Sequence, residues 1–284
     1  MLNNKYDFVV VFSVKNANPN GDPLNGNRPR INYDGYGEVS DVCIKRKIRN
    51  VLMDKGEKIF VQSDDKKTDD FQSLKDRLEK TLPSNVLKSK NKTELAEAAC
   101  KEWIDVRSFG QVLAFKGGDT KGVSVGIRGP VSIQSAYSAD PISVSSIQIT
   151  KSVNNEGDGS SKSSDTMGMK HRVDFGLYSF AGSINPQLAT KTGFDDNDAE
   201  LIKLSLIDLF ENDASSARPD GSMEVLKVFW WKHNNNNGQY SSAKVHRTVH
   251  INRLVNELEA KDFNDYLIEV DNLDGLELYE FQGK

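Results

Sequence analysis

The order of apolar and polar positions predicts strands and helices separated by long polar segments. Residues 6–14 are β-branched and aromatic, and this run is too short for a typical helix, so it predicts a buried first strand. Residues 16–37 are rich in Asn, Gly, Asp and Pro and predict a long ordered loop, which in a compact domain is usually functional. Ser40 or Asp41 then caps a predicted helix that runs to about Lys55.

The middle of the chain combines charged stretches with short apolar runs. Residues 62–92 predict one amphipathic helix within a charged insertion, and a second helix begins at about Thr93. A strand is predicted at residues 131–133, and a change in the phase of alternation after Val144 predicts a β-bulge. Residues 151–170 contain few apolar side chains and are predicted to be disordered in the free protein.

The last third of the chain again alternates strands and helices. Apolar alternation over 173–180 predicts a strand, and a helix follows from about 195 to 211 with carboxylates at its positive N-terminus. Residues 223–232 predict a strand in which one of two adjacent tryptophans faces outward. A helix near 251–261 and a strand near 265–280 complete the pattern. Together these elements predict an α+β fold with helices on one face of a sheet.

Composition limits the class of protein. With 284 residues the chain is long enough for one large domain with insertions. Its 37 Lys and Arg against 41 Asp and Glu give a net charge of −4, so a nucleic acid would have to bind a local basic patch. We expect a cytoplasmic protein, because no membrane helix or signal peptide is visible and two cysteines make no disulfide framework.

The predicted first helix carries the strongest sign of a ligand. Its apolar face is flanked by cations, namely Lys45, Arg46 and Arg49 on one side and Lys47 on the other. Like charges four residues apart cost a few tenths of a kcal/mol, and a polyanion would remove that repulsion and release counterions. A solvated cationic face explains the pattern equally well. The upstream cations Arg28 and Arg30 favour a track for phosphates.

Two further segments suit contacts with nucleic acid. Asn18, Asn20 and Gly21 offer amide donors for sugar and phosphate groups, although an ordinary turn explains them at least as well. Met167 and Met169 precede a basic run and suit insertion between bases. The alternative for the methionines is a strand start with one Met in the core, and the sequence leaves both interpretations open.

Signals for catalysis are weak. The Gly-rich segment 117–129 lacks the Gly-Lys-Ser/Thr of a phosphate-binding loop. His246 and His250 are four residues apart, but no helix signal or cysteine supports a zinc site. The aspartates of 64–70 alternate with lysines and predict a solvated insertion rather than a metal site. We therefore expect no cofactor, no metal and no catalytic group.

Several of these segments together resemble a known family. In the N-terminal block the matching residues are Tyr6–Phe8, Asn18–Pro23, Gly26–Arg30 and Val39–Asn50. This block resembles the backbone subunit of type I-C Cascade, the CRISPR-associated family-seven protein in the Csd-two branch of the RAMP superfamily. Further matches follow in the same order at Asp105–Gly110, Arg128–Val131, Thr166–His171, Gly176–Tyr178 and Lys191–Phe194.

The resemblance implies a fold and a function. It implies a single RAMP domain over 1–284, with an RRM-like (ferredoxin-like) palm, a finger region at about 56–102 and a thumb at about 151–170. Copies of such a protein assemble head to tail along the spacer of a CRISPR RNA and leave bases free to pair with a target DNA strand. The implied partners are CRISPR RNA, target DNA, copies of the chain itself and other Cascade subunits. The subunit itself is not catalytic.

The resemblance and the residue pattern together give a candidate RNA-binding set. Lys45, Arg46 and Arg49 are expected to contact phosphates beside Asn18, Asn20, Gly21 and Arg28. Arg107, Phe109 and Gln111 are expected beside the RNA path, and Met167, Met169, Lys170 and His171 at the thumb. The alternatives are a metal-dependent endoribonuclease, with Asp22 or Asp41 as a candidate catalytic group, and a protein–protein adaptor without affinity for RNA.

Overall fold

An antiparallel sheet runs through the protein. The computed structural model describes residues 1–284 except 90, 115–123, 151–166 and 256–258. The sheet has the order β14-β11-β1-β10-β8-β4, and β7 and β9 also pair with β10. Its strands are β1 (Tyr6–Ala17), β4 (Tyr36–Val39), β7 (Val131–Ile133), β8 (Ala136–Pro141), β9 (Val144–Thr150), β10 (Met167–Ile184), β11 (Met223–Lys232) and β14 (Glu277–Phe281).

The inner part of this sheet has the ferredoxin-like connection. Strand β1 leads into α1 (Asp41–Asp54), β7 and β8 precede β10, and α7 (Asp196–Ile207) leads from β10 towards β11. In the sheet, β1 lies between β11 and β10, and β8 lies outside β10. A β-α-β-β-α-β chain with this strand order is the RRM-like arrangement. The predicted α+β, RRM-like palm is therefore confirmed.

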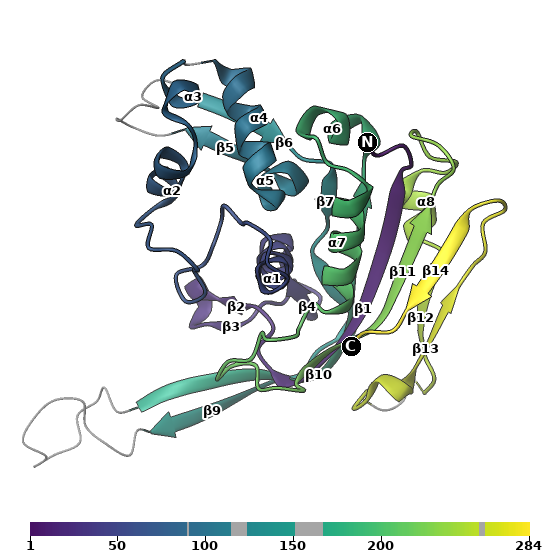
Figure 1. Ribbon diagram of the computed structural model, residues 1–284. Coiled ribbons are helices and arrows are strands. Elements are labelled where there is room, and N and C mark those ends of the chain that lie inside the picture. The colour runs from purple at the N-terminus through teal and green to yellow at the C-terminus, as the bar shows by residue number, and fades with distance from the viewer. Residues whose placement is uncertain (90, 115–123, 151–166, 256–258) are drawn as a thin grey trace, which may run out of the picture.

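Helices and strands cover both faces of the sheet (Figure 1). Trp230 packs in the core on the face of α1 and α7, and Trp231 packs in a second core on the opposite face. The prediction that one tryptophan faces outward is wrong, because the C-terminal elements cover that second face. The remaining covering elements are α6 (Pro186–Thr192) on the α7 side, and α8 (Ser242–His246), β12 (Val249–Arg253), η3 (Phe263–Asp265) and β13 (Tyr266–Val270) on the other.

The C-terminal third differs most from the sequence prediction. The helix predicted near 251–261 is wrong, since β12 lies at its start and pairs with β13. Val249 and Ile251 alternate with polar residues and pack against the second core, which is the pattern of a half-buried strand. The strand predicted near 265–280 consists of β13 and β14, which belong to different sheets.

Residues 56–128, which we call the insertion, have an apolar core of their own. Phe60, Leu78 and Trp103 are among its buried side chains. The single helix predicted over 62–92 is wrong, because the residue before Pro83 has extended backbone and separates two helices. The elements of the insertion are α2 (Leu74–Thr81), α3 (Ser84–Ser89), α4 (Lys92–Glu102), α5 (Ile104–Phe109), β5 (Gly110–Ala114) and β6 (Ser124–Arg128).

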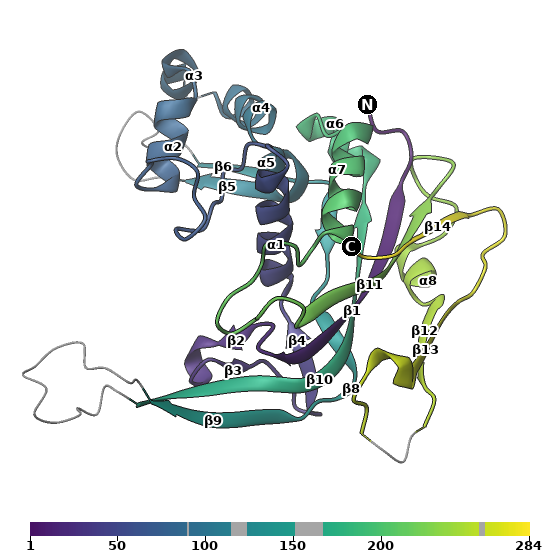
Figure 2. The same cartoon turned by 60° about the horizontal axis from the view of Figure 1, so that its bottom comes forward.

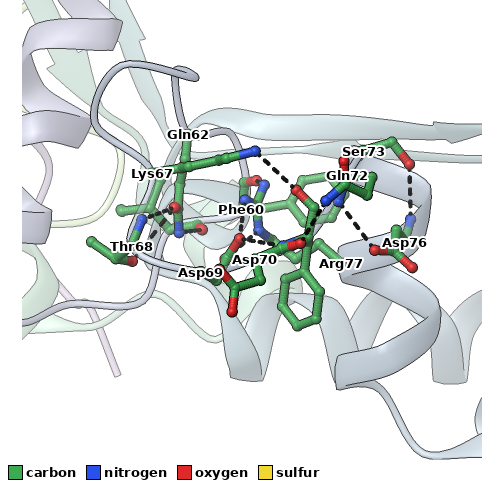
Figure 3. A network of polar contacts seen from close by, with 12 residues as sticks. Phe60, Gln62, Lys67, Thr68, Asp69, Asp70, Gln72, Ser73, Asp76 and Arg77 are labelled. Carbon is green, nitrogen blue, oxygen red and sulfur yellow. Dashed lines mark hydrogen bonds and ion pairs between the residues drawn. The ribbon is translucent and has the colours of Figure 1, made fainter.

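A buried arginine fixes the loop that enters the insertion. Arg77 donates to both carboxylate oxygens of Asp69 at 2.8 Å and to the carbonyl oxygen of Phe60 at 2.6 Å (Figure 3). The hydrogen bonds that Arg77 donates to Asp69 lower the pKa of this carboxyl group. Arg77→Ala is expected to lower the free energy of unfolding by about 2 kcal/mol, because it leaves a buried carbonyl without its donor. Urea denaturation measures this, and Lys80→Ala in the same helix, which removes an exposed pair with Asp76, is the control.

Strands β9 and β10 continue beyond the palm as a two-stranded arm, which comprises residues 144–150 and 167–173. Their register runs without interruption from Thr150–Met167 to Val144–Val173, so the β-bulge predicted in this segment is wrong. Strand β10 already includes residues 167–170, which were expected to be disordered. The rest of that predicted segment, 151–166, lies outside the described residues.

The arm begins where the side chains of β10 change the face of the sheet to which they point. Phe175 packs on the β12–β13 side, whereas Val173 packs in the core on the α1 side. At the same level of β1, Asn16 has a left-handed backbone with φ of 56°. Because side chains alternate along a strand, residues 167, 169 and 171 share the face of Val173 and point to the α1 side.

Candidate nucleic-acid interface

The polar loop before α1 is tied to the start of that helix. The Oγ of Ser40 accepts a hydrogen bond from the Cys43 N–H at 3.3 Å, as an N-cap does. The Oδ1 of Asn20 accepts from both the N–H and the hydroxyl of Ser40 at 2.9 Å. Asn18 is buried and donates from Nδ2 to the Asn27 carbonyl at 2.7 Å. Asn18 and Asn20 therefore shape the loop itself.

The same loop packs Gly21 closely against Asn27. Gly21 lies in the short hairpin of β2 (Gly21–Asp22) and β3 (Arg28–Pro29), and a Cβ there would lie 2.0 Å from Asn27 Oδ1. Between the strands, η1 (Pro23–Asn25) is capped by the side chain of Asp22. Asn20, immediately before the hairpin, joins it to Ser40 at the start of α1.

Three of the four cations on α1 pair with carboxylates, and Lys45 and Lys47 are two of them. Lys45 pairs with Asp41 one turn earlier at 2.8 Å. Lys47 is only 1% exposed and pairs with Asp213, from the segment between α7 and β11. The interpretation of Lys47 as an exposed flank of a cationic face is therefore wrong. These ion pairs relieve much of the repulsion that the sequence suggested.

The other two cations lie on one side of α1. Arg49 donates from Nε to Asp105 at 2.9 Å and stacks over Phe109 at 5.1 Å. Within the described part of the chain, Arg46 makes no hydrogen bond or ion pair. The Ser63 side chain and, further, the charge of Arg46 lower the pKa of the exposed Asp65. Arg46 is thus the α1 cation whose charge is least compensated.

A hollow of about 390 Å³, which we call the α1 pocket, opens beside these arginines. Three guanidinium groups border it, from Arg46, Arg49 and Arg218, and no Asp or Glu is among its described lining residues. Such a set of donors favours an anion. The complete lining is Pro19, Asn20, Gly21, Ser40, Val42, Cys43, Arg46, Arg49, Val61, Gln62, Ser63 and Arg218.

The arm presents a second group of predicted residues on the same side of the sheet. Arg28 donates to Ser146 of the arm at 2.7 Å and lies 3.4 Å from Nδ1 of His171. Met167 and Met169 are 61% and 55% exposed. In both views the arm and the insertion project to one side of the sheet, with α1 between them (Figures 1 and 2). The α1 pocket and the arm thus border one region of the surface.

Comparison with known proteins gives the family. The family model described as CRISPR-associated protein Cas7 matches residues 4–271. The chain belongs to the Cas7 family. A protein of Haloferax volcanii named CRISPR-associated protein Cas7 is 27% identical over 241 residues, which cover 79% of this chain and 69% of that protein.

Chains of two solved structures are also similar to this chain. A chain of a "CRISPR RNA-guided surveillance complex, pre-nicking" is 14% identical with a TM-score of 0.48, covering 80% of this chain and 78% of that one. A chain of a "CRISPR RNA-guided surveillance complex" is 17% identical with a TM-score of 0.44, covering 80% and 68%.

Some predicted residues of this Cas7 chain lie outside the α1 pocket. Arg107 donates from Nε and Nη2 to the two carboxylate oxygens of Asp198, at 2.9 and 2.8 Å, and so joins α5 to α7. Gln111 lies on β5. Lys170 lies opposite Ile147 in the register of β9 and β10. Because side chains alternate along a strand, Lys170 points away from the face that carries His171. The predicted set is therefore divided among the α1 pocket, the arm and an α5–α7 contact, while Asn18, Lys45 and Gln111 belong to none of the three.

Arg218 is the charged residue of the pocket that the sequence did not predict. It lies in a polar segment between α7 and β11, and no local pattern sets it apart. Its position follows from tertiary packing against α1.

The described residues show no metal cluster and no membrane-spanning helix. No group of three or more His, Cys, Asp or Glu in them is arranged to hold a metal ion. His246 contacts the Gly182 carbonyl and His250 contacts Asp271, so the two histidines do not share a ligand. No described helix is both long and apolar enough to cross a bilayer.

Proposed function

We propose that this Cas7-family chain is a non-catalytic subunit that binds CRISPR RNA through its phosphates and forms the helical backbone of a type I-C Cascade complex. The α1 pocket carries this proposal, because it gathers three guanidinium groups without a lining carboxylate among the described residues. Contacts from arginines to phosphates do not depend on the bases. A subunit that coats a guide RNA of any spacer sequence needs contacts of this kind.

The proposed partners are CRISPR RNA, further copies of the chain, other Cascade subunits and a target DNA strand paired to the guide. Exposed apolar side chains on both faces of the arm support a protein contact there, since Met167 and Met169 lie on one face and Ile147 and Ile149 on the other. A contact between unlike surfaces that does not close produces a helical assembly. In this proposal 1–284 form one domain, 56–102 the finger region and 151–170 the thumb.

The test is binding of the full chain to labelled oligouridylate and to an unrelated unstructured RNA over a series of salt concentrations. We expect equal affinity for both RNAs and a linear fall of log affinity with log salt, as for phosphate contacts. We also expect the RNA to remain intact with Mg²⁺. Preference for one sequence, binding without salt dependence, or no binding contradicts the phosphate contacts. Cleavage that EDTA abolishes contradicts the non-catalytic role.

A further inference from the structure

Arg218 approaches the α1 pocket from outside the helix that carries its other two arginines. It belongs to the segment between α7 and β11, and its side chain is 19% exposed. Backbone hydrogen bonds join Ser215 N–H to the Arg218 carbonyl at 2.8 Å and Arg218 N–H to the Ser215 carbonyl at 3.0 Å. This tight turn fixes the Cα of Arg218 at the border of the pocket.

The guanidinium of Arg218 is bound through its Nε atom alone among the described residues. Its Nε donates to Oδ2 of Asp213 at 3.0 Å, and no hydrogen bond from its Nη groups is found within the described residues. An arginine held through Nε still presents two terminal nitrogens, which suit a phosphate. Since Arg218 lines the α1 pocket with Arg46 and Arg49, this pocket is the place where such a phosphate would lie.

Asp213 is itself fixed by the interior of the protein. Its carboxylate accepts a hydrogen bond from Lys47, a buried residue of α1. The Nζ of Lys47 lies 5.4 Å from the ring centroid of Phe210. Burial lowers the pKa of Lys47, while the charge of Asp213 opposes that shift. The neighbouring Asn212 has a left-handed backbone, with φ of 54°, and donates to Asp54 at the end of α1. The segment is therefore attached to α1 at two points.

The Asp213 carboxylate is shared by two basic side chains. Lys47 and Arg218 both contact it. Lys47 is enclosed, so a ligand in the pocket meets the guanidinium of Arg218. Asp213 thus connects a buried anchor on α1 to an arginine at the ligand surface.

We propose that Arg218 is a further phosphate ligand for RNA in the α1 pocket, and that Asp213 is the positioning residue that orients its guanidinium. This inference rests on the proposed function and adds a contact that comes from the segment between α7 and β11. It predicts separate effects for the two residues, because Arg218 supplies charge whereas Asp213 supplies orientation.

The first experiment measures the affinity of the full chain for oligouridylate over a series of salt concentrations. Arg218→Ala is expected to reduce the slope of log affinity against log salt by ~0.7, which corresponds to about fourfold weaker binding at physiological salt. Arg218→Lys keeps the charge and is expected to retain the slope. An unchanged slope for Arg218→Ala overturns the assignment of Arg218 as a phosphate ligand.

The second experiment isolates the positioning role. Asp213→Asn alone leaves Lys47 buried without a partner and risks unfolding. The double variant Lys47→Met with Asp213→Asn removes both buried charges, and Lys47→Met alone is the matched control in which Asp213 still holds Arg218. We expect the double variant to bind roughly three- to tenfold more weakly than Lys47→Met, because Arg218 must be ordered on binding. Its salt slope should stay the same. Equal affinities of the two variants overturn the positioning role.

The salt slopes of Arg46→Ala and Arg247→Ala show whether a failure concerns the role of Arg218 or the proposed function itself. If Arg46→Ala reduces the salt slope and Arg218→Ala does not, only the role of Arg218 is wrong. If neither variant changes the slope, RNA phosphates do not occupy the α1 pocket and the proposed function fails there. Arg247 follows α8 on the opposite face of the sheet, and its replacement is expected to change nothing.

Discussion

Asp105→Ala is expected to lower the free energy of unfolding by about 3–5 kcal/mol. The side chain of Asp105 is 1% exposed, and its oxygens accept from the Phe60 N–H at 2.7 Å, the Val61 N–H at 3.1 Å and Arg49 Nε at 2.9 Å. Its removal leaves two backbone donors and a mostly buried guanidinium without their acceptor. Asp105 joins the insertion to α1, so the loss of its side chain should destabilise both of these parts.

Urea denaturation of the wild type and the variant measures this loss. Asp41→Ala is the control, because it removes a more exposed carboxylate from a pair with Lys45 on the same helix and should cost at most about 1 kcal/mol. Asp105→Asn keeps an acceptor oxygen and should be less destabilising than Asp105→Ala. A loss below about 1 kcal/mol for Asp105→Ala would show that Asp105 does not hold the insertion against α1.

The double variant Arg28→Ala with Arg46→Ala is expected to bind RNA about tenfold more weakly at physiological salt and to reduce the salt slope by ~1.4. Arg46 has no carboxylate partner among the described residues, and the contacts found for Arg28 with the arm are to the neutral Ser146 and to His171. Each therefore presents a largely uncompensated charge. Salt-dependent fluorescence anisotropy with oligouridylate measures both quantities.

Lys45→Ala is the matched control for that double variant. Because Asp41 already neutralises Lys45, removal of the Lys45 side chain should change the salt slope by less than removal of the Arg46 side chain. If the double variant keeps the wild-type slope, the charges of Arg28 and Arg46 do not contact phosphates. If Lys45→Ala has the larger effect, the RNA path runs along a different side of α1.

The sequence predicts the palm well because its strands and helices are marked locally. The apolar run of β1, the cap at Ser40 and the strand at 223–232 all appear where the pattern places them. The outward tryptophan was predicted wrongly because a local pattern does not show that β12 and β13 cover the second face. The helix near 251–261 was predicted wrongly because a short apolar run fits either a helix or a strand.

The candidate site is only partly readable from the sequence. Local spacing placed Lys45, Lys47 and Arg49 on a cationic helix, but Lys47 and Arg49 pair with Asp213 and Asp105, which are 166 and 56 residues away along the chain. Charge compensation across such distances depends on the fold. The same holds for Arg218, which reaches the α1 pocket through the packing of its segment against α1.

The most direct test of RNA binding on the α1 side is ultraviolet cross-linking of the full chain to an oligonucleotide that contains 4-thiouridine, followed by mass spectrometry of the cross-linked peptides. We predict cross-links in peptides from residues 18–49, from the arm at 167–171 and around Arg218. Cross-links confined to residues 241–270, on the opposite face of the sheet, would contradict this prediction.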